Sequence, residues 1–342
     1  MISDNQASTT DDRLPTTGYQ RPATDNRSPK ITALAGGIGA AKFLLGLIHL
    51  LPPENLTIIA NTGDDIELFG LRVCPDIDTV TYTLAGVINE TMGWGLANDT
   101  FESLKWMARY GEADWFNLGD KDLATHIYRA NLLHQGVTLT EITSRIAASL
   151  GVGAKILPMT DSYTPTRVVT DEGEMHFQEY FVRRRCQPQV KELHFQNIES
   201  TQPAEGVIAA IQTSDAVIIC PSNPFISIGP ILAVPGVRQA LKQTRAEVIA
   251  ITPIIAGQAL KGPAADMLRD LGHEVSARGV AALYKDFVNT FVLDESDADL
   301  KTSIEQFGLQ VVAMNTVMQT LADKQRLAVE VLKMLTCDSH KE

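Results

Sequence analysis

A cluster of acidic residues lies in the stretch NTGDDIELFGLRVCPDIDT (61–79). Carboxylates this close together repel one another unless a cation lies among them, and Arg72 is the one basic residue of the stretch. Oxygen-rich ligand sets without histidine suit hard cations such as Mg²⁺. Asp is equally a common turn residue, because its carboxylate bonds nearby backbone N–H groups. The stretch predicts metal ligands, a catalytic base, or turns; its acidic residues are Asp64, Asp65, Glu67, Asp76 and Asp78.

A glycine-rich segment, AGGIGAAK, contains Gly36, Gly37, Gly39 and Lys42. Glycines between a strand and a helix let backbone N–H groups approach a phosphate, and the helix N-terminus adds partial positive charge. The segment is neither a Walker A motif nor a full GxGxxG fingerprint, so a simple tight turn is the alternative. Lys42 favours a phosphate site, because a cation in the first helical turn opposes the helix dipole unless an anion is nearby.

Two further loops follow apolar segments that read as strands. CPSNPFISIGP (220–230) holds Ser222 and Asn223 between prolines, which stiffen the backbone, although a proline-rich turn is the alternative. TPIIAG (252–257) follows the next strand in the same way. These loops and the glycine segment are expected to line one crevice.

Other polar and aromatic residues carry less weight. LGDKD (118–122) begins a predicted helix, where the helix dipole favours Asp120 and Asp122 without any function. His126 and His134 lie on that helix without a third ligand, and we interpret them as packing or surface residues. Trp94 and the pair Trp115 and Phe116 either fill the core or stack on a flat ring.

The elements that position these residues alternate between strands and helices. The sequence predicts strands at 56–61, 216–220, 247–252, 290–294 and in LQVVA, and helices at 203–212, 235–243, 263–271, 279–287, 297–306 and 315–335. Helices are also expected at 99–110, 120–134 and 139–150, the last with Thr140 as N-cap and Gly151 as its stop, and TRVVT and MHFQEYFV are expected to form a hairpin. This pattern predicts an α/β fold with a Rossmann-like, doubly wound, mostly parallel sheet, whose ligands bind at the carboxyl ends of the strands.

Composition sets the wider limits. Residues 1–29 are polar and proline-containing and are expected to be a disordered tail, before a single α/β domain at 30–336 with a helical insertion at about 99–150. A net charge of −12 makes nucleic acid an unsuitable partner. The four cysteines are scattered, without a CxxC pair, and no apolar run is long enough for a membrane span. We therefore expect a cytoplasmic protein.

The motifs GGIGAAK, NTGDD, CPDIDTVTYTLAG, WFNLGDKDLATHIYR, HFQEYFV, PSNPFISIGPIL and TPIIAG occur in this order. From about Ile31 to Asp294 the chain thereby resembles the 2-phospho-L-lactate transferase (CofD-like) family of coenzyme F-420 biosynthesis. The resemblance implies a Mg²⁺-dependent enzyme, and a homodimer. Its donor is a guanylylated phospho-acid (lactyl, enolpyruvyl or glyceryl), its acceptor is the ribityl hydroxyl of the deazaflavin Fo, and GMP is released.

The resemblance also implies residue roles. Gly36, Gly37, Gly39 and Lys42 would hold the diphosphate, and Ser222, Asn223 and the 252–257 loop would line the guanosine side. Asp64 and Asp65 would bind Mg²⁺ or deprotonate the acceptor hydroxyl, while Asp76 and Asp78 would contact the deazaflavin or complete the metal shell. Asn61 and Lys121 are expected to bind substrate; Lys121 stands where the family often has Arg, and it lacks the bidentate guanidinium.

Two other functions compete with this one. A non-catalytic, nucleotide-sugar-binding regulatory protein of the same superfamily would keep the glycine and PSNP loops without a full acidic acceptor site. A nicotinamide-dependent dehydrogenase is disfavoured, because it expects GxGxxG and an acidic residue about 20 positions further on.

Overall fold

A seven-stranded parallel sheet forms the centre of the protein, whose computed structural model describes residues 28–259 and 262–337. The strand order is β14-β13-β10-β9-β1-β2-β5, and every neighbouring pair is parallel. The predicted α/β fold is confirmed, whereas all but the last two residues of the predicted 1–29 tail lie outside the described residues. The strands are β1 (Ile31–Ala35), β2 (Leu56–Ala60), β5 (Lys155–Pro158), β9 (Ala216–Ile219), β10 (Glu247–Ile251), β13 (Thr290–Asp294) and β14 (Gln310–Met314).

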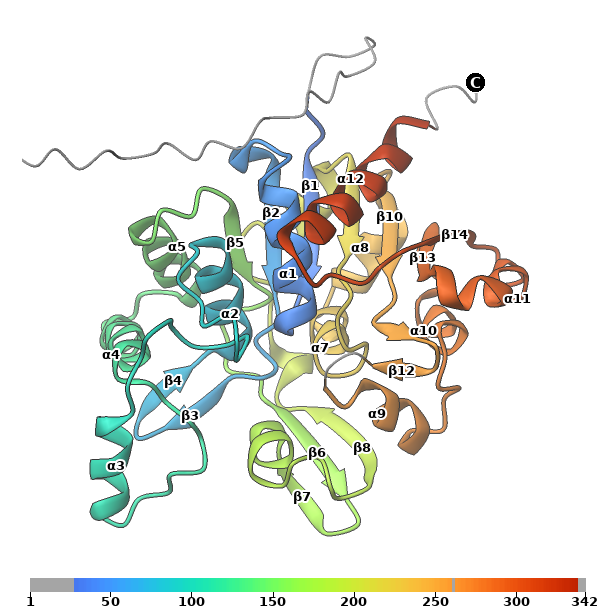
Figure 1. Cartoon of the computed structure of the whole chain (residues 1–342). Coiled ribbons are helices and arrows are strands. Elements are labelled where there is room, and N and C mark those ends of the chain that lie inside the picture. The colour runs from blue at the N-terminus through green and yellow to red at the C-terminus, as the bar shows by residue number, and fades with distance from the viewer. Residues whose placement is uncertain (1–27, 260–261, 338–342) are drawn as a thin grey trace, which may run out of the picture.

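Helices cover both faces of this sheet (Figure 1). Side chains alternate along each strand, so that Ile31, Ala33 and Ala35 of β1 face one helical layer and Leu34 faces the other. The first layer contains α1 (Gly37–Ile48), α2 (Pro75–Leu84), α5 (Leu139–Ser149) and α12 (Leu321–Cys337). The second contains α6 (Val207–Thr213), α7 (Ile228–Ala233), α8 (Val237–Gln243), α9 (Ala264–Asp270), α10 (Ala277–Tyr284) and α11 (Lys301–Glu305).

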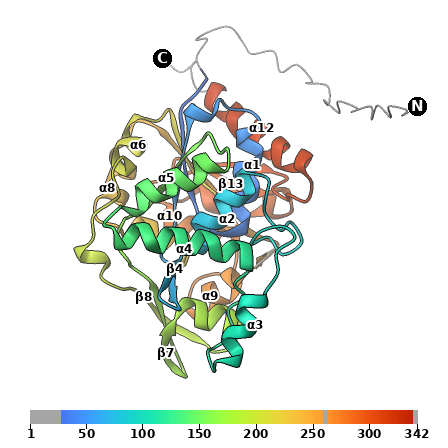
Figure 2. The same ribbon diagram turned by 90° about the vertical axis from the view of Figure 1, so that its left-hand side faces the viewer.

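The segment between α2 and β5 is helical, with α3 (Glu102–Arg109), α4 (Asp120–His134) and α5, and it lies along one side of the molecule (Figure 2). The predicted cap of α5 is wrong: Thr138, not Thr140, is the N-cap, and its hydroxyl accepts a hydrogen bond from the Glu141 N–H at 3.2 Å. The hydroxyl of Thr140 instead donates to Asp161 at 2.8 Å. Gly151 ends the helix as predicted, in a left-handed conformation with φ of 76°.

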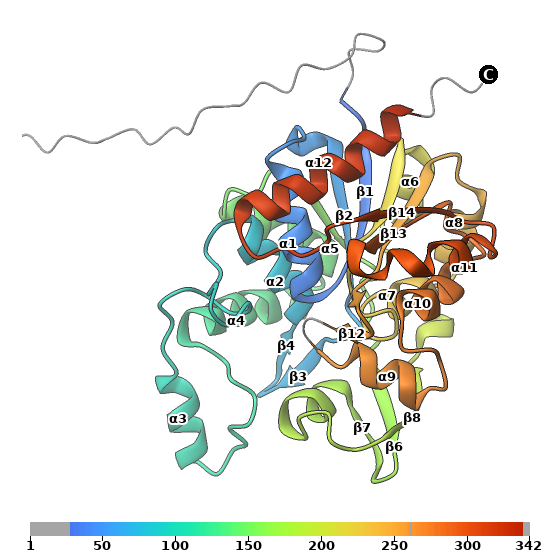
Figure 3. The same cartoon turned by 45° about the vertical axis from the view of Figure 1, so that its right-hand side comes forward.

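Two small antiparallel units extend beyond the carboxyl ends of the central strands (Figures 1 and 3). One is the hairpin β3 (Ile66–Leu68) and β4 (Leu71–Val73), and the other is the sheet β7-β6-β8, formed by β6 (Thr166–Thr170), β7 (Gly173–His176) and β8 (Val190–Phe195). The predicted strand MHFQEYFV is wrong beyond His176, where the chain turns into a π-helix, Glu179–Arg183. Phe177 and Tyr180 are both buried there, a spacing that fits a helical turn rather than a strand.

The C-terminal part also differs from its prediction in one place. The sequence predicts a final helix over 315–335, but 315–320 is a loop and α12 begins at Leu321. The carboxylate of Asp323 accepts hydrogen bonds from the N–H groups of Gln319 and Thr320, which fixes this start. The remaining short elements are the 3₁₀ turns at Pro53–Asn55, Ile198–Ser200 and Glu295–Leu300 and the bridge of β11 (Ile254–Ile255) with β12 (Gln258–Ala259). Among the described helices, none has the length and hydropathy needed to cross a membrane.

Candidate active site

A cavity of about 650 Å³ opens at the carboxyl edge of the central sheet. The loops after β1, β2, β9, β10 and β14 contribute to its wall, as expected for a parallel sheet. The glycine segment, Ser222 and Asn223, and the 252–257 loop therefore line one cavity. From the other elements, its wall includes Tyr82, Trp94, Phe116, Asp122, His126, Phe177 and Phe181.

The glycine segment lines the cavity at the start of α1. Gly36 is extended, Gly37 has a φ of 72°, and the Gly37 N–H donates to Oδ1 of Asp76 at 2.8 Å. A Cβ on Gly39 would lie 2.3 Å from the carbonyl oxygen of Pro221, so the two loops touch through backbone. The predicted place of Lys42 is wrong: α1 begins at Gly37, so Lys42 lies in its second turn, where the dipole argument is weaker. Lys42 still lines the cavity, and its Nζ donates to the Met318 carbonyl at 3.2 Å.

Asn61 brings two of the acidic residues together. It directly follows β2, is fully buried, and its Nδ2 donates to Oδ1 of Asp64 at 3.1 Å and to Oδ2 of Asp76 at 2.8 Å. The same nitrogen lies 3.0 Å from the Ile226 carbonyl oxygen, and Oδ1 of Asn61 accepts from the Gly63 N–H at 2.8 Å. Asn61 is not in the cavity wall, whereas Asp64 and Asp76 are. Asn61 therefore supports the Asp64–Asp76 pair from outside the cavity wall.

The environment of the pair disfavours two negative charges. Burial raises the pKa of Asp76 to about 6, although hydrogen bonds from Asn61 and Gly37 oppose the shift. Burial, and then the neighbouring Asp76, raise the pKa of Asp64 well above its usual range. The two side chains are 7% and 5% exposed, so water screens their repulsion little. A cation placed between them would stabilise both in the charged form.

Asp65 lies in a different environment from Asp64. Its carboxylate pairs with Nε of Arg72 at 2.9 Å and accepts from the Cys74 thiol at 3.1 Å, and it lies outside the cavity wall. Arg72 also donates to the carbonyl oxygens of Asp161 and Ser162, and these hydrogen bonds connect the β3–β4 hairpin to the segment after β5. Burial raises the pKa of Asp65 despite Arg72.

Asp78 belongs to a second cluster, which also contains Asp122, His126 and Arg129. Its Oδ1 accepts from Nη2 of Arg129, and its Oδ2 lies 3.8 Å from Nδ1 of His126. Nε2 of His126 lies 3.3 Å from Oδ1 of Asp122, which also accepts from the Tyr82 hydroxyl at 2.7 Å. His126, which the sequence predicts to be a packing or surface residue, is buried, and it lines the cavity among charged groups. The signal in the sequence was its spacing: Asp122, His126 and Arg129 share one face of α4.

The remaining predicted residues are placed as follows. The Ser222 hydroxyl donates to the Gly36 carbonyl at 2.8 Å, and Oδ1 of Asn223 accepts from the Phe225 N–H at 2.9 Å, so both side chains stiffen the cavity wall. Lys121 lies outside the wall, and its Nζ donates to the carbonyls of Ala97 and Asn98. Trp94 and Phe116 reach the cavity, while Trp115 packs behind Phe116 in an edge-to-face contact.

Comparison with known proteins gives consistent relatives. A phosphoenolpyruvate transferase of Thermobifida fusca is 43% identical over 313 residues, covering 87% of this chain and 94% of the relative. A phosphoenolpyruvate transferase of Streptomyces coelicolor is 40% identical, covering 89% and 98%. A 2-phospho-L-lactate transferase of Methanosarcina acetivorans is also 40% identical, covering 86% and 95%.

Solved structures and a family profile complete the comparison. A UPF0052 family protein, BH3568 of Bacillus halodurans, superposes with a TM-score of 0.63 at 15% identity, covering 90% of this chain and 99% of that one, a likeness that concerns the fold alone. The profile described as 2-phospho-L-lactate transferase CofD matches residues 31–335. With this match over most of its length, and with these relatives, the chain belongs to the CofD family of 2-phospho-L-lactate transferases.

Proposed function

We propose that this protein transfers a phospho-acid from a guanosine-diphosphate-linked donor to the ribityl hydroxyl of the deazaflavin Fo, releasing GMP, in coenzyme F-420 biosynthesis. The observation that carries the proposal is the single cavity in which a glycine-lined helix start lies directly against the Asp64–Asp76 pair. Backbone N–H groups favour a diphosphate, and the carboxylates suit a divalent cation beside it. Aromatic side chains in the cavity wall offer flat surfaces for a ring system.

The Asp64–Asp76 pair fits Mg²⁺ as its cofactor. Both residues supply oxygen ligands and both are buried. Burial, and then repulsion from Asp76, raise the pKa of Asp64, and a bound dication would remove this cost. We propose Asp64 and Asp76 as the residues that hold Mg²⁺, in place of the expected pair Asp64 and Asp65, because Arg72 already neutralises Asp65. When bound, Mg²⁺ supplies charge neutralisation for the diphosphate oxygens.

The reaction is a substitution at phosphorus. The acceptor hydroxyl oxygen forms a bond to the phosphorus that carries the acid, the bond from that phosphorus to the bridging oxygen breaks, and GMP leaves with that oxygen. The hydroxyl proton passes to a carboxylate of the cavity wall. The protein contributes chiefly positioning and electrostatic stabilisation, the two effects that dominate phosphoryl transfer.

The two parts of the donor have proposed places. Gly36, Gly37 and Lys42 hold the diphosphate at the start of α1, while Ser222, Asn223 and the 252–257 loop line the guanosine side.

We also propose that the protein is cytoplasmic and forms a homodimer. Sedimentation of the purified protein would test the dimer. The acid carried is one of lactate, enolpyruvate and glycerate, which differ by single groups.

The test combines purified protein, Mg²⁺, Fo and each of the three guanylylated donors, with the products separated and weighed by mass spectrometry. We expect GMP and one Fo phosphodiester in preference to the others. Formation of no phosphodiester from any donor, with intact guanosine binding, would instead support the non-catalytic binding protein.

A further inference from the structure

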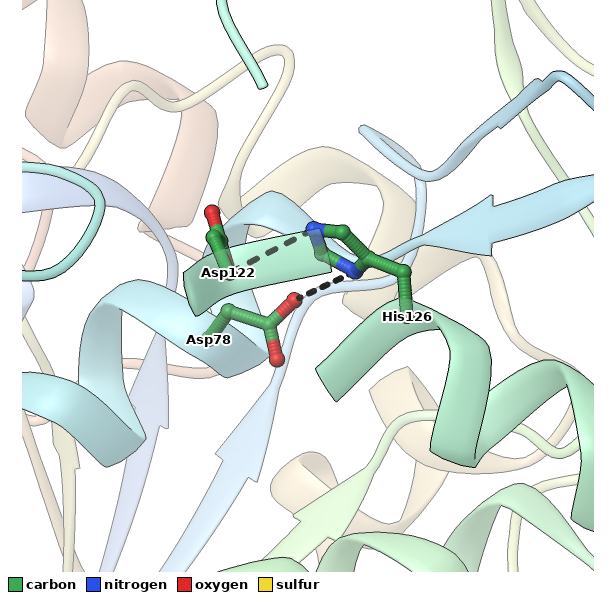
Figure 4. Close-up of side chains that lie close together, drawn as sticks. All are labelled: Asp78, Asp122 and His126. Carbon is green, nitrogen blue, oxygen red and sulfur yellow. Dashed lines mark ion pairs between the residues drawn. The ribbon is translucent and has the colours of Figure 1, made fainter. Parts of the chain in front are cut away.

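The cluster of Asp78, Asp122 and His126 has the composition of a metal site (Figure 4). One ligand atom from each residue lies within 4.8 Å of the others, and all three residues are buried in the cavity wall. Two carboxylates and an imidazole are a common ligand set for transition metals. The contacts of His126 argue against this interpretation.

Arg129 determines which ring nitrogen of His126 carries a proton. Its Nη1 lies 3.0 Å from Nδ1 of His126, and a guanidinium has donors but no acceptor, so Nδ1 must be the acceptor. With Nδ1 as an acceptor, the proton of the ring resides on Nε2. Neither ring nitrogen keeps a lone pair for a metal, because Nδ1 uses its own on Arg129 and Nε2 is protonated.

Arg129 also holds Asp78. The side chain is 1% exposed, its Nη2 pairs with Oδ1 of Asp78, and its Nη1 lies 3.3 Å from the Arg72 carbonyl oxygen. Burial opposes the charge of Arg129, but the adjacent carboxylate of Asp78 outweighs burial and raises the pKa of the guanidinium. A permanent positive charge thus lies within the cluster, and it repels a metal cation.

Oδ2 of Asp78 is buried and has no hydrogen-bond partner among the described residues. Nε2 of His126, by contrast, lies 3.3 Å from Oδ1 of Asp122, so its proton faces that carboxylate. A buried acceptor without a donor is costly, so Oδ2 of Asp78 indicates a ligand or a functional role. A ligand hydroxyl can donate to Oδ2 of Asp78, whereas a metal ion cannot bind to the N–H of His126.

We propose that Arg129 is a positioning residue that fixes the proton of His126 on Nε2, facing Asp122, and so leaves Oδ2 of Asp78 as the acceptor of this cluster for a ligand hydroxyl instead of a metal ion. The tautomer and the exclusion of metal concern the protein alone. The identity of the hydroxyl, as one of those on the polyol chain of the acceptor, rests on the proposed function.

The decisive measurement is nitrogen NMR of the full protein with ¹⁵N-labelled histidine, without substrates. The chain has seven histidines, and His126→Asn assigns the signals of interest. We expect Nδ1 of His126 to be of the unprotonated, pyridine type, Nε2 to carry the proton, and neither to shift when one equivalent of Zn²⁺ is added. His134→Asn is the matched control on the same helix. A protonated Nδ1, or a Zn²⁺-induced shift of either nitrogen, would overturn the proposal.

Removal of the guanidinium provides the second test. In Arg129→Met, Nδ1 loses its donor, so we expect the two tautomers to exchange and Zn²⁺ to shift the His126 signals; Arg145→Met, at an exposed arginine on α5, should leave them unchanged. If Arg129→Met does not fold because Asp78 is unpaired, Arg129→Met combined with Asp78→Asn removes that charge and still reports the tautomer. An unchanged Nε2–H tautomer in both variants would show that Arg129 does not set it.

A kinetic comparison separates this role from the proposed function. Arg129→Lys keeps the charge but lacks the second donor of the fork, and we expect KM for the Fo acceptor to rise about tenfold while KM for the donor stays within twofold. If the wild-type enzyme shows no transfer at all, the proposed function fails, and the NMR result still stands. If transfer occurs and Arg129→Lys changes the donor KM alone, the assignment to the acceptor fails.

Discussion

Asp64 and Asp76 accept hydrogen bonds from one and the same nitrogen, Nδ2 of Asn61, at 3.1 and 2.8 Å. The shared donor fixes the position of each carboxylate relative to the other, although Asp64 comes from the loop after β2 and Asp76 from the first turn of α2. It also lowers the pKa of both, against the effect of burial. Asn61 therefore acts on the proposed metal site without lining the cavity.

Replacement of this donor should weaken metal binding. Asn61→Leu keeps the side-chain volume but removes the shared N–H group, and we expect the affinity for Mn²⁺ or Mg²⁺ to fall about 10- to 100-fold, as for other residues that support metal ligands. The lost hydrogen bonds should also lower the free energy of unfolding by about 1–3 kcal/mol. Titration calorimetry measures the first and urea denaturation the second. Asn55→Leu, far from the cavity, is the control, and an equal affinity in both variants would contradict the role of Asn61.

The neighbours Asp64 and Asp65 should respond oppositely to the same substitution. In Asp64→Asn the repulsion from Asp76 is lost, so we expect the urea midpoint at pH 7 to stay the same or rise while turnover is abolished. Asp65→Asn leaves the buried guanidinium of Arg72 without its counter-charge and should destabilise the protein by about 3–5 kcal/mol. Denaturation of both variants, with GMP release as the activity measurement, tests the pair. Loss of folding in Asp64→Asn would make its role structural.

Much of the fold was predictable because local pattern and topology agree. β13 begins and ends where the apolar run TFVLD does, and α4 covers the predicted 120–134. The misplaced elements depend on contacts from elsewhere in the chain. The turn at Phe177 buries its ring with Val168 and Tyr180 in one apolar cluster, and the three-residue spacing of Phe177 and Tyr180 in MHFQEYFV is too short a signal to identify it.

The site was predictable as a set of loops but not as a set of partners. Parallel topology brings the loops after β1, β2 and β9 to one edge, which the strand pattern alone implies. The sequence could not distinguish Asp64 from Asp65, because the difference comes from Arg72 on the facing strand of a short hairpin. The role of His126 likewise depends on Asp78, which lies on another helix.

Crowding around the glycine segment gives a third prediction. Gly37 has a positive φ, but a Cβ there meets no atom closer than 4.0 Å, so Gly37→Ala should cost about 1–2 kcal/mol of backbone strain. A Cβ on Gly39 meets the Pro221 carbonyl oxygen at 2.3 Å and must displace that loop. We therefore expect Gly39→Ala to raise KM for the guanylylated donor more than Gly37→Ala does. Steady-state kinetics of the two variants, with thermal melting to verify folding, tests this order; the reverse order would indicate that φ, not loop contact, limits donor binding.

His176 should make stability depend on pH. Its Nε2 lies 3.0 Å from the Asp65 carbonyl oxygen and its Nδ1 accepts from the Gln178 N–H at 3.0 Å, so a second ring proton would face an N–H group. Burial, which outweighs the hydrogen bond to Asp65, lowers the pKa of His176 from 6.5 to about 4. The unfolded chain therefore binds the proton more tightly, and the contribution of His176 is fully present above pH 6.5 and is lost as the pH falls towards about 4.

The expected size of this effect sets the experiment. When the pH is lowered from 7 to 5, preferential protonation of His176 in the unfolded chain should lower the free energy of unfolding by on the order of 1 kcal/mol, after allowance for the partial exposure of this side chain. His176→Gln should show a correspondingly smaller loss over the same interval, whatever its stability at pH 7, whereas His194→Gln, at an exposed histidine on β8, should keep the full loss. Urea denaturation at the two pH values measures each difference. An equal loss in wild type and His176→Gln would mean that protonation of His176 does not oppose folding, and that the hydrogen bond from Gln178 is exchanged without cost.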